Sequence, residues 1–317
     1  MFITTVVTMT HATTHATRAS RAPPPDKDER LRTYRHATWP EREAMHAAIA
    51  EHKADAIARR VELGRRYLEA HSSDIDVPYE RAVTTVDLID ATRAVRDEAI
   101  AVAKGRASQH DSGSLQYPAL ARDFAADAEA IRFATSPRVL APIVRYCGML
   151  PVLFNFFVTR AYQETINEQS AHHFHIDPED TISFKVFIQL TDVDDDCGPF
   201  HALPAHLTRD VLHAVGYKGI AFLTDTRVNE LVGWDSVVKL TGPAGTVGFV
   251  DTTRCLHFGG RPRKAGKPVR DQLVFQYLLP TSLLFPIDGD ATHPRFLPQL
   301  GATGDEHWDA LIGARFT

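Results

Sequence analysis

The sequence predicts a mainly β fold with helices, in which N-terminal helices brace a double-sheet barrel or sandwich such as a jelly roll. Strong helix formers dominate residues 39–148. Residues 150–280 instead contain short runs rich in Val, Phe, Ile and Thr that end at Gly, Pro or Asp, with no helical pattern between them. No internal repeat is present. These features favour a single domain over residues 31–317.

Residues 1–30 are expected to form a flexible arm. The opening MFITTVVTMT is mildly apolar but lacks the basic start and the long apolar core of a secretory signal. The stretch after it is rich in Ala, Thr, Arg and Pro and has no periodicity.

Three helices are expected over residues 39–69, 85–104 and 137–148. Pro40 suits the first turn of the first helix. A threonine cap precedes the second helix, and Gly105 ends it. A serine-proline pair starts the third helix in the same way.

Five strands are expected in the second half, at PVLFNFFVTRAY, TISFKVFIQL, GIAFLT, GTVGFV and DQLVFQYLL. In the second of these, alternation puts Lys185 and Gln189 on one face and only apolar side chains on the other. The apolar face is predicted to pack in the core, and the mixed face lines either solvent or a pocket. Residues 281–317 form a C-terminal extension to which the sequence assigns no role.

Composition narrows the classes of function. The net charge is −5, which gives no electrostatic case for nucleic acid or an anionic membrane, and no apolar run is long enough to span a bilayer. The three cysteines are odd in number and far apart, which argues against a disulfide framework and favours a reducing cytoplasm. We expect a small-molecule partner, and the sequence leaves the oligomeric state open.

The segment HHFHIDPED contains a candidate metal pair. Side chains at i and i+2 of an extended strand point to one side, so His175 and Asp177 could reach the same ion. Taken alone, the pair is more typical of a strand that ends in an Asp-Pro turn. His257, in CLHFGG after a buried-looking strand, offers the missing third ligand. Two histidines and a carboxylate can occupy one face of an iron ion and leave three positions open.

Arg270 stands at the start of the last expected strand, thirteen residues after His257. A guanidinium grips a carboxylate through two parallel hydrogen bonds, and a buried one needs an anionic partner. That partner could be a dicarboxylate keto acid or, in a structural role, Asp271. Gln272 shares the Arg270 face by alternation and could add a donor.

The ordered set of these elements resembles the phytanoyl-CoA dioxygenase-like family: His175-x-Asp177, then KVFIQLTDVDDDCGPFHALPAHL, then GPAGTVGFVDTTRCLHFGG, then Arg270. The resemblance covers roughly residues 150–280. It implies a double-stranded β-helix fold. It also implies an iron(II)- and 2-oxoglutarate-dependent dioxygenase that uses O2, hydroxylates or otherwise oxidises a C–H bond of a small metabolite, and releases succinate and CO2. By position it implies that His175, Asp177 and His257 bind iron and that Arg270 binds the distal carboxylate of 2-oxoglutarate.

Two neighbouring residues keep alternatives open. His173 precedes His175 by two positions, and a His-x-His pair also occurs in cupin-like proteins that bind iron or zinc without 2-oxoglutarate or without catalysis. With His175 and Asp177 as ligands, His173 becomes a neighbour of the site, a substrate contact or a polar residue at the rim. Lys185 could contact 2-oxoglutarate or substrate, or could lie at a solvent-facing edge.

Overall fold

The structure is a computed structural model, which describes residues 27–34, 36–106, 116–120, 129–161, 172–178, 180–219, 221–262, 270–285 and 301–313. Its helices are α1 (Lys27–Tyr34), α2 (Trp39–His52), α3 (Ala54–Ala70), α4 (Ile89–Arg106), α5 (Glu129–Thr135), α6 (Pro137–Cys147), α7 (Ala205–Val215), α8 (Asp225–Val232) and α9 (Glu306–Leu311). Its strands are β1 (Val83–Asp87), β2 (Gln116–Leu120), β3 (Val152–Ala161), β4 (Ser183–Gln189), β5 (Phe200–Ala202), β6 (Val238–Leu240), β7 (Thr246–Asp251), β8 (His257–Phe258) and β9 (Arg270–Leu278).

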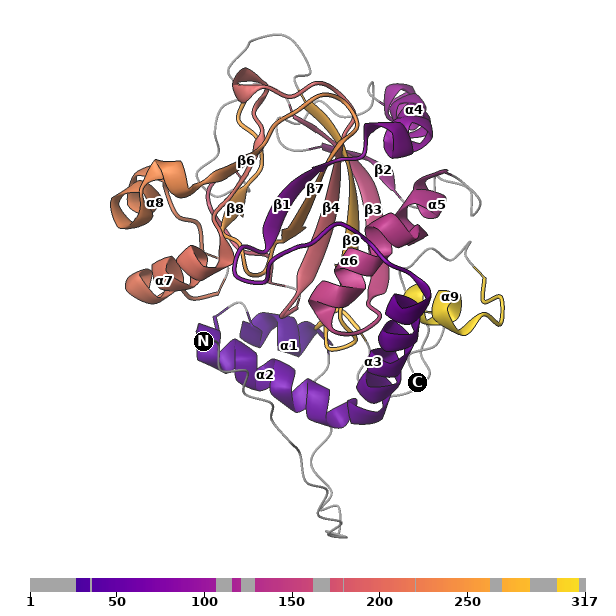
Figure 1. The fold of residues 1–317 in the computed structure, drawn as a ribbon. Coiled ribbons are helices and arrows are strands. Elements are labelled where there is room, and N and C mark those ends of the chain that lie inside the picture. Colours follow the sequence, from indigo (N-terminus) through magenta and orange to yellow (C-terminus); the bar gives the residue numbers. More distant parts are fainter. Residues whose placement is uncertain are drawn as a thin grey trace, which may run out of the picture.

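The strands form two antiparallel sheets. The larger sheet has the order β1-β7-β4-β9-β3-β2, and the smaller has the order β6-β5-β8. In Figure 1, α5 and α6 lie against the larger sheet, whereas α7 and α8 lie beside the smaller one. The fold class is therefore mixed helix and antiparallel sheet. The combination of helices with a sheet was predicted, but among the described residues the helices cover more of the chain than the strands, so the fold is not mainly β.

Alternation along β4 places the core and the site on opposite faces of the larger sheet. One face carries Phe184, Val186 and Ile188, which pack with helical residues in the main hydrophobic cluster. The opposite face carries Phe187, which packs with residues of the smaller sheet. The two sheets approach closely at Gly248, where a side-chain carbon would lie 2.5 Å from Leu240 Cδ1. Lys185 therefore lies on the face that looks toward the smaller sheet.

Several expected elements differ from those observed. The helix expected over residues 39–69 breaks at Lys53, whose buried ammonium donates to the Pro280 carbonyl (2.9 Å). The helix expected from Thr85 begins at Ile89, because Thr84 and Thr85 pair with β7 as an edge strand. The expected third helix is confirmed as α6, which ends at Gly148 in the left-handed conformation (φ 69°).

The segment expected to contain only strands also contains α7 and α8. The described residues of GIAFLT form no strand, although Leu223 makes an isolated bridge to Phe174. At the N-terminus, α1 takes up the last four residues of the expected arm, and residues 1–26 lie outside the described residues. Of the C-terminal extension, residues 286–300 and 314–317 lie outside them as well.

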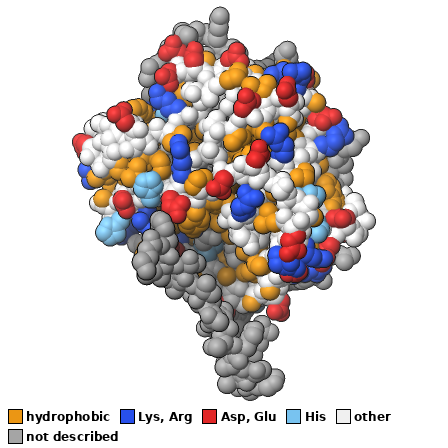
Figure 2. Space-filling view, in the orientation of Figure 1, with side chains coloured by type: hydrophobic (Ala, Val, Ile, Leu, Met, Phe, Trp, Pro, Cys, Tyr) orange, Lys and Arg blue, Asp and Glu red, His pale blue; other side chains and the backbone are white. Residues whose placement is uncertain are grey.

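The distribution of charged side chains on the surface is consistent with the small net charge. Figure 2 shows acidic and basic side chains interspersed over the visible face. Among the described residues, no helix combines the length and the apolar character needed to cross a bilayer. Cys147, Cys197 and Cys255 form no disulfide with one another.

Candidate metal centre

Two histidines face each other across an antiparallel bridge. The backbone N–H of His175 donates to the His257 carbonyl and the N–H of His257 donates to the His175 carbonyl, each at 2.9 Å. Directly paired residues of antiparallel strands project to the same side, so the two imidazoles lie together with ring centroids 4.4 Å apart. The local pairing of β8 with the segment before β4 therefore creates half of the site.

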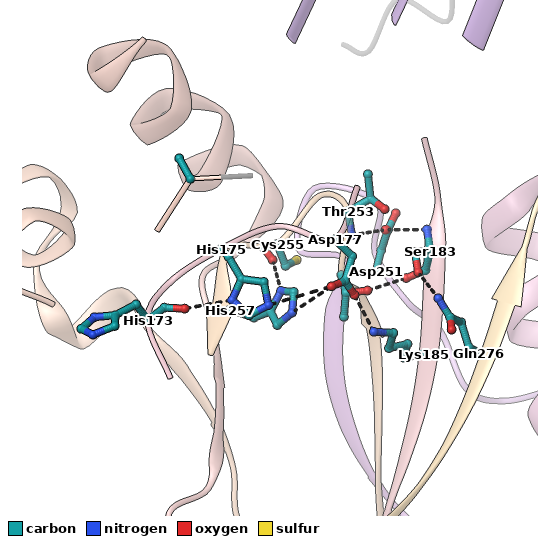
Figure 3. A network of polar contacts seen from close by, with 12 residues as sticks. His173, His175, Asp177, Ser183, Lys185, Asp251, Thr253, Cys255, His257 and Gln276 are labelled. Atoms are coloured by element: carbon teal, nitrogen blue, oxygen red, sulfur yellow. Dashed lines mark hydrogen bonds and ion pairs between the residues drawn. The ribbon is translucent and has the colours of Figure 1, made fainter. Parts of the chain in front are cut away.

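Backbone carbonyls orient both rings. His175 Nδ1 donates to the His173 carbonyl and His257 Nδ1 donates to the Cys255 carbonyl, both at 2.9 Å. A carbonyl can only accept, so each Nδ1 carries the hydrogen and each Nε2 offers its lone pair to the interior (Figure 3). This outer hydrogen bond is the usual support of a metal-bound imidazole.

Asp177 completes a three-ligand cluster. Its Oδ1 lies 3.9 Å from His175 Nε2 and 3.8 Å from His257 Nε2, and the ligand atoms of the three residues all lie within 4.8 Å of one another. Two ligand atoms that each lie about 2.1 Å from an ion, at right angles, are about 3 Å from each other. Oδ1 therefore needs to move less than about 1 Å closer to each nitrogen for the three atoms to bind one ion. The structure thus brings together the three side chains that the sequence predicted as metal ligands.

Electrostatics keeps the donors in their metal-binding forms. Burial lowers the pKa of His257 to about 3 and also lowers the pKa of His175, so both rings are neutral at neutral pH. Burial alone would raise the pKa of Asp177, but the adjacent Lys185 ammonium outweighs it and holds that pKa well below its usual range. The cluster is thus two neutral imidazoles and one carboxylate.

A second buried carboxylate holds the backbone around the site, and sequence analysis missed it. Asp251 ends β7 and accepts from Ser183 N (3.3 Å), Thr253 N (3.1 Å) and Tyr146 Oη (2.9 Å). The next residue, Thr252, accepts the backbone N–H of Asp177 at 3.0 Å. An acid followed by two threonines directly after an apolar strand was the available signal, because such residues bond to the backbone of the turn they begin.

Lys185 takes part in the site. Its Nζ lies 2.5 Å from Asp177 Oδ2, and its side chain is 15% exposed (Figure 3). The mixed face of β4 thus lines the site, and the lysine contacts a candidate ligand.

Arg270 is buried, with 2% of its surface exposed, and its Nε and Nη1 have no hydrogen-bond partner among the described residues. Burial lowers the pKa of Arg270 to about 10, so the guanidinium stays charged at neutral pH. It packs beside Gly260, three residues after His257; a side-chain carbon there would lie 3.1 Å from Arg270 Cζ and 1.7 Å from the Gly198 carbonyl oxygen. Unsatisfied buried donors of this kind fit an anionic ligand.

The two remaining candidates, Gln272 and His173, differ in whether their side chains face the site. Gln272 lies on the Arg270 face, and its Nε2 donates to Gln189 Oε1 (3.1 Å), which lies on the site face of β4. The imidazole of His173 points away from the triad in Figure 3, and its two ring nitrogens are buried without a partner among the described residues. His173 supports the triad through its carbonyl rather than its ring.

Comparison with known proteins gives distant structural neighbours. No protein-family model and no curated protein match the sequence. The chain is similar to HygX from Streptomyces hygroscopicus with nickel and 2-oxoglutarate bound (13% identity over 63% of this chain and 83% of that one, TM-score 0.42) and to EctD from S. alaskensis with bound Fe (13%, 64% and 74%, 0.45). It is also similar to the epimerase SnoN in complex with Fe3+, alpha ketoglutarate and nogalamycin RO (16%, 76% and 94%, 0.46). With each of these TM-scores below 0.5, the side chains themselves are the basis for assigning a function.

Proposed function

We propose that the protein is an iron(II)- and 2-oxoglutarate-dependent dioxygenase that oxidises a C–H bond of a small molecule. The observation that carries this proposal is the convergence of His175 Nε2, His257 Nε2 and Asp177 Oδ1 from one side, with the unsatisfied guanidinium of Arg270 next to the strand that bears His257. Two imidazoles and one carboxylate form the ligand set typical of non-haem iron oxygenases. The buried arginine extends that set to a carboxylate-bearing co-substrate.

Each side chain has one role in this proposal. The triad holds Fe(II), with its imidazoles fixed by carbonyls and its carboxylate ionised. Arg270, whose Nε and Nη1 have no partner among the described residues, binds the distal carboxylate of 2-oxoglutarate, and Gln272 lies beside it. When bound, the iron, 2-oxoglutarate and O2 supply the oxidising chemistry and yield succinate and CO2. The apolar wall, which includes Phe187 and Phe200, excludes water.

The connectivity of the strands supports a jelly-roll assignment. From β3 onward the chain passes from the larger sheet to the bridge at His175, returns for β4, crosses to β5 and β6, and then alternates through β7, β8 and β9. Passing between two facing sheets in this way is typical of a jelly roll, of which the double-stranded β-helix is a variant. We extend the proposal to one oxygenase domain over residues 31–317, similar to the phytanoyl-CoA dioxygenase-like family, in a reducing cytoplasm.

The same three donors also suit zinc in a hydrolytic or purely structural centre. A zinc or cupin-like centre without a co-substrate leaves two Arg270 nitrogens, Nε and Nη1, buried without a partner among the described residues, and burying unsatisfied donors is costly. Arg270 therefore favours the 2-oxoglutarate-dependent class.

Turnover of 2-oxoglutarate in the absence of substrate tests the proposal. Protein loaded with Fe(II) and supplied with ascorbate and carboxyl-labelled 2-oxoglutarate is expected to release labelled CO2 slowly, in proportion to protein and only with iron. Asp177→Ala serves as the matched negative variant. Turnover equal to that of free iron, together with no binding of 2-oxoglutarate to the metal-loaded protein, would refute it.

A further inference from the structure

The two oxygens of the Asp177 carboxylate have different partners. Oδ1 faces His175 Nε2 and His257 Nε2 at 3.9 and 3.8 Å, whereas Oδ2 accepts from Lys185 Nζ at 2.5 Å. Figure 3 shows the ammonium on the side of the carboxylate away from the imidazoles. One carboxylate oxygen, Oδ1, is therefore placed to bind a metal, and the other, Oδ2, is bound to the lysine.

Lys185 lies on an inner strand of the larger sheet. It lies in the middle of β4, where it pairs with Val250 of β7 on one side and with Gln276 of β9 on the other. Ladders on both flanks fix its backbone, and a side chain that is 15% exposed has lost most of its hydration. The ammonium is thus fixed opposite Oδ2 by the sheet.

The way Asp177 binds determines how many coordination positions stay open on the metal ion. A carboxylate binds a metal through one oxygen or through both. In a six-coordinate ion, two imidazoles and one oxygen leave three positions, which is the number that 2-oxoglutarate (two) and O2 (one) require. Binding through both oxygens would leave only two.

We propose that Lys185 is a positioning residue that makes Asp177 bind the metal through Oδ1 alone and so keeps the third position open. The inference rests on the proposed function, because it requires that the triad holds a metal. It assigns Lys185 a role toward the Asp177 carboxylate rather than toward 2-oxoglutarate. A lysine that only balanced charge would change how tightly the metal binds without changing how many carboxylate oxygens bind it.

Infrared spectroscopy with Co(II), an oxygen-stable substitute for Fe(II), distinguishes these roles without 2-oxoglutarate or turnover. In protein labelled with 13C-carboxyl aspartate, the metal-loaded minus metal-free difference spectrum reports the ligating aspartate. The asymmetric and symmetric carboxylate bands lie far apart when one oxygen binds and close together when both do. We expect a wide separation in wild type and Lys185→Arg, and a narrow one in Lys185→Met.

Lys239→Met is the matched control, because it removes another lysine–aspartate pair (Lys239 Nζ to Asp195 Oδ1, 2.8 Å) at the surface. It should keep the wide separation. Lys185→Ala gives the same readout if Lys185→Met does not fold. A wide separation in folded Lys185→Met or Lys185→Ala, or a wild type that binds no Co(II), would overturn the inference. If the wild type did not turn over 2-oxoglutarate but the band separation still narrowed in Lys185→Met, only the proposed function would be rejected.

Discussion

Replacing Arg270 should have opposite effects on stability and on co-substrate binding. Its guanidinium is buried and has two nitrogens without partners among the described residues. Arg270→Met removes that charge and preserves much of the side-chain volume, so the variant without ligand should unfold at a higher temperature than wild type. The same variant should lose the stabilisation that 2-oxoglutarate gives to the metal-loaded wild type.

The magnitude follows from the burial of the charge. Burial lowers the pKa of Arg270 from 12.5 to about 10, which corresponds to a cost of about 3 kcal/mol for keeping it ionised. Part of that cost should be recovered in Arg270→Met. Losing a charge-assisted hydrogen bond costs about 1.5 to 3 kcal/mol, so 2-oxoglutarate should bind roughly ten- to a hundredfold more weakly to Arg270→Lys, which cannot form the two-pronged contact.

Melting curves and calorimetric titration of 2-oxoglutarate into the metal-loaded protein measure both effects. Arg60 provides a matched control, because its guanidinium is also 2% exposed but donates to the carbonyls of Leu150 (3.1 Å), Pro151 (3.3 Å) and Ala310 (2.7 Å). Arg60→Met should therefore melt lower than wild type and bind 2-oxoglutarate normally once folded. If Arg270→Met melted lower than wild type, or if Arg270→Lys bound 2-oxoglutarate as wild type does, the assigned role would be wrong.

Three further predictions concern the triad and one buried acid. His175→Ala, Asp177→Ala and His257→Ala should each abolish stoichiometric metal binding while circular dichroism stays unchanged; one metal per chain retained in any of them would remove that residue from the ligand set. Because burial lowers the pKa of His257 to about 3, metal affinity should change little between pH 6.5 and pH 8, and a steep rise over that range in a calorimetric titration would contradict the neutral form of the ring. Burial raises the pKa of Asp180 to about 8, so between about pH 4 and 8 the native state keeps a proton that the unfolded chain releases, and the free energy of unfolding should fall as pH rises through this window. Asp180→Asn should flatten that dependence in urea unfolding at pH 5 and pH 8, and an unchanged slope would show that other groups cause it.

Much of the β fold could be predicted because its longest strands are locally distinctive. β3, β4, β7 and β9 are long runs of β-branched and aromatic residues, and the alternation along β4 separates the apolar from the mixed face correctly. The short strands β5 and β8 were not predicted. They have three and two residues, and their pairing depends on tertiary contacts that no local pattern records.

The triad could be predicted because it depends on two short patterns with strong chemical meaning, and the support around it could not. Asp251 and Tyr146 contribute through one long-range hydrogen bond between β7 and α6, which spacing does not reveal. Lys185 was placed on the correct face, but its partner was not predicted. A strand position specifies a direction and not which of several polar groups lies at the end of a long side chain.

An anaerobic titration tests the central claim most directly: that His175, Asp177 and His257 hold one iron(II) with open positions for 2-oxoglutarate. One equivalent of Fe(II) followed by 2-oxoglutarate should produce the weak visible charge-transfer band of the iron–keto acid chelate, which should saturate at one co-substrate per chain and be missing from His257→Ala. No band in folded wild-type protein, or an equal band in His257→Ala, would contradict the claim.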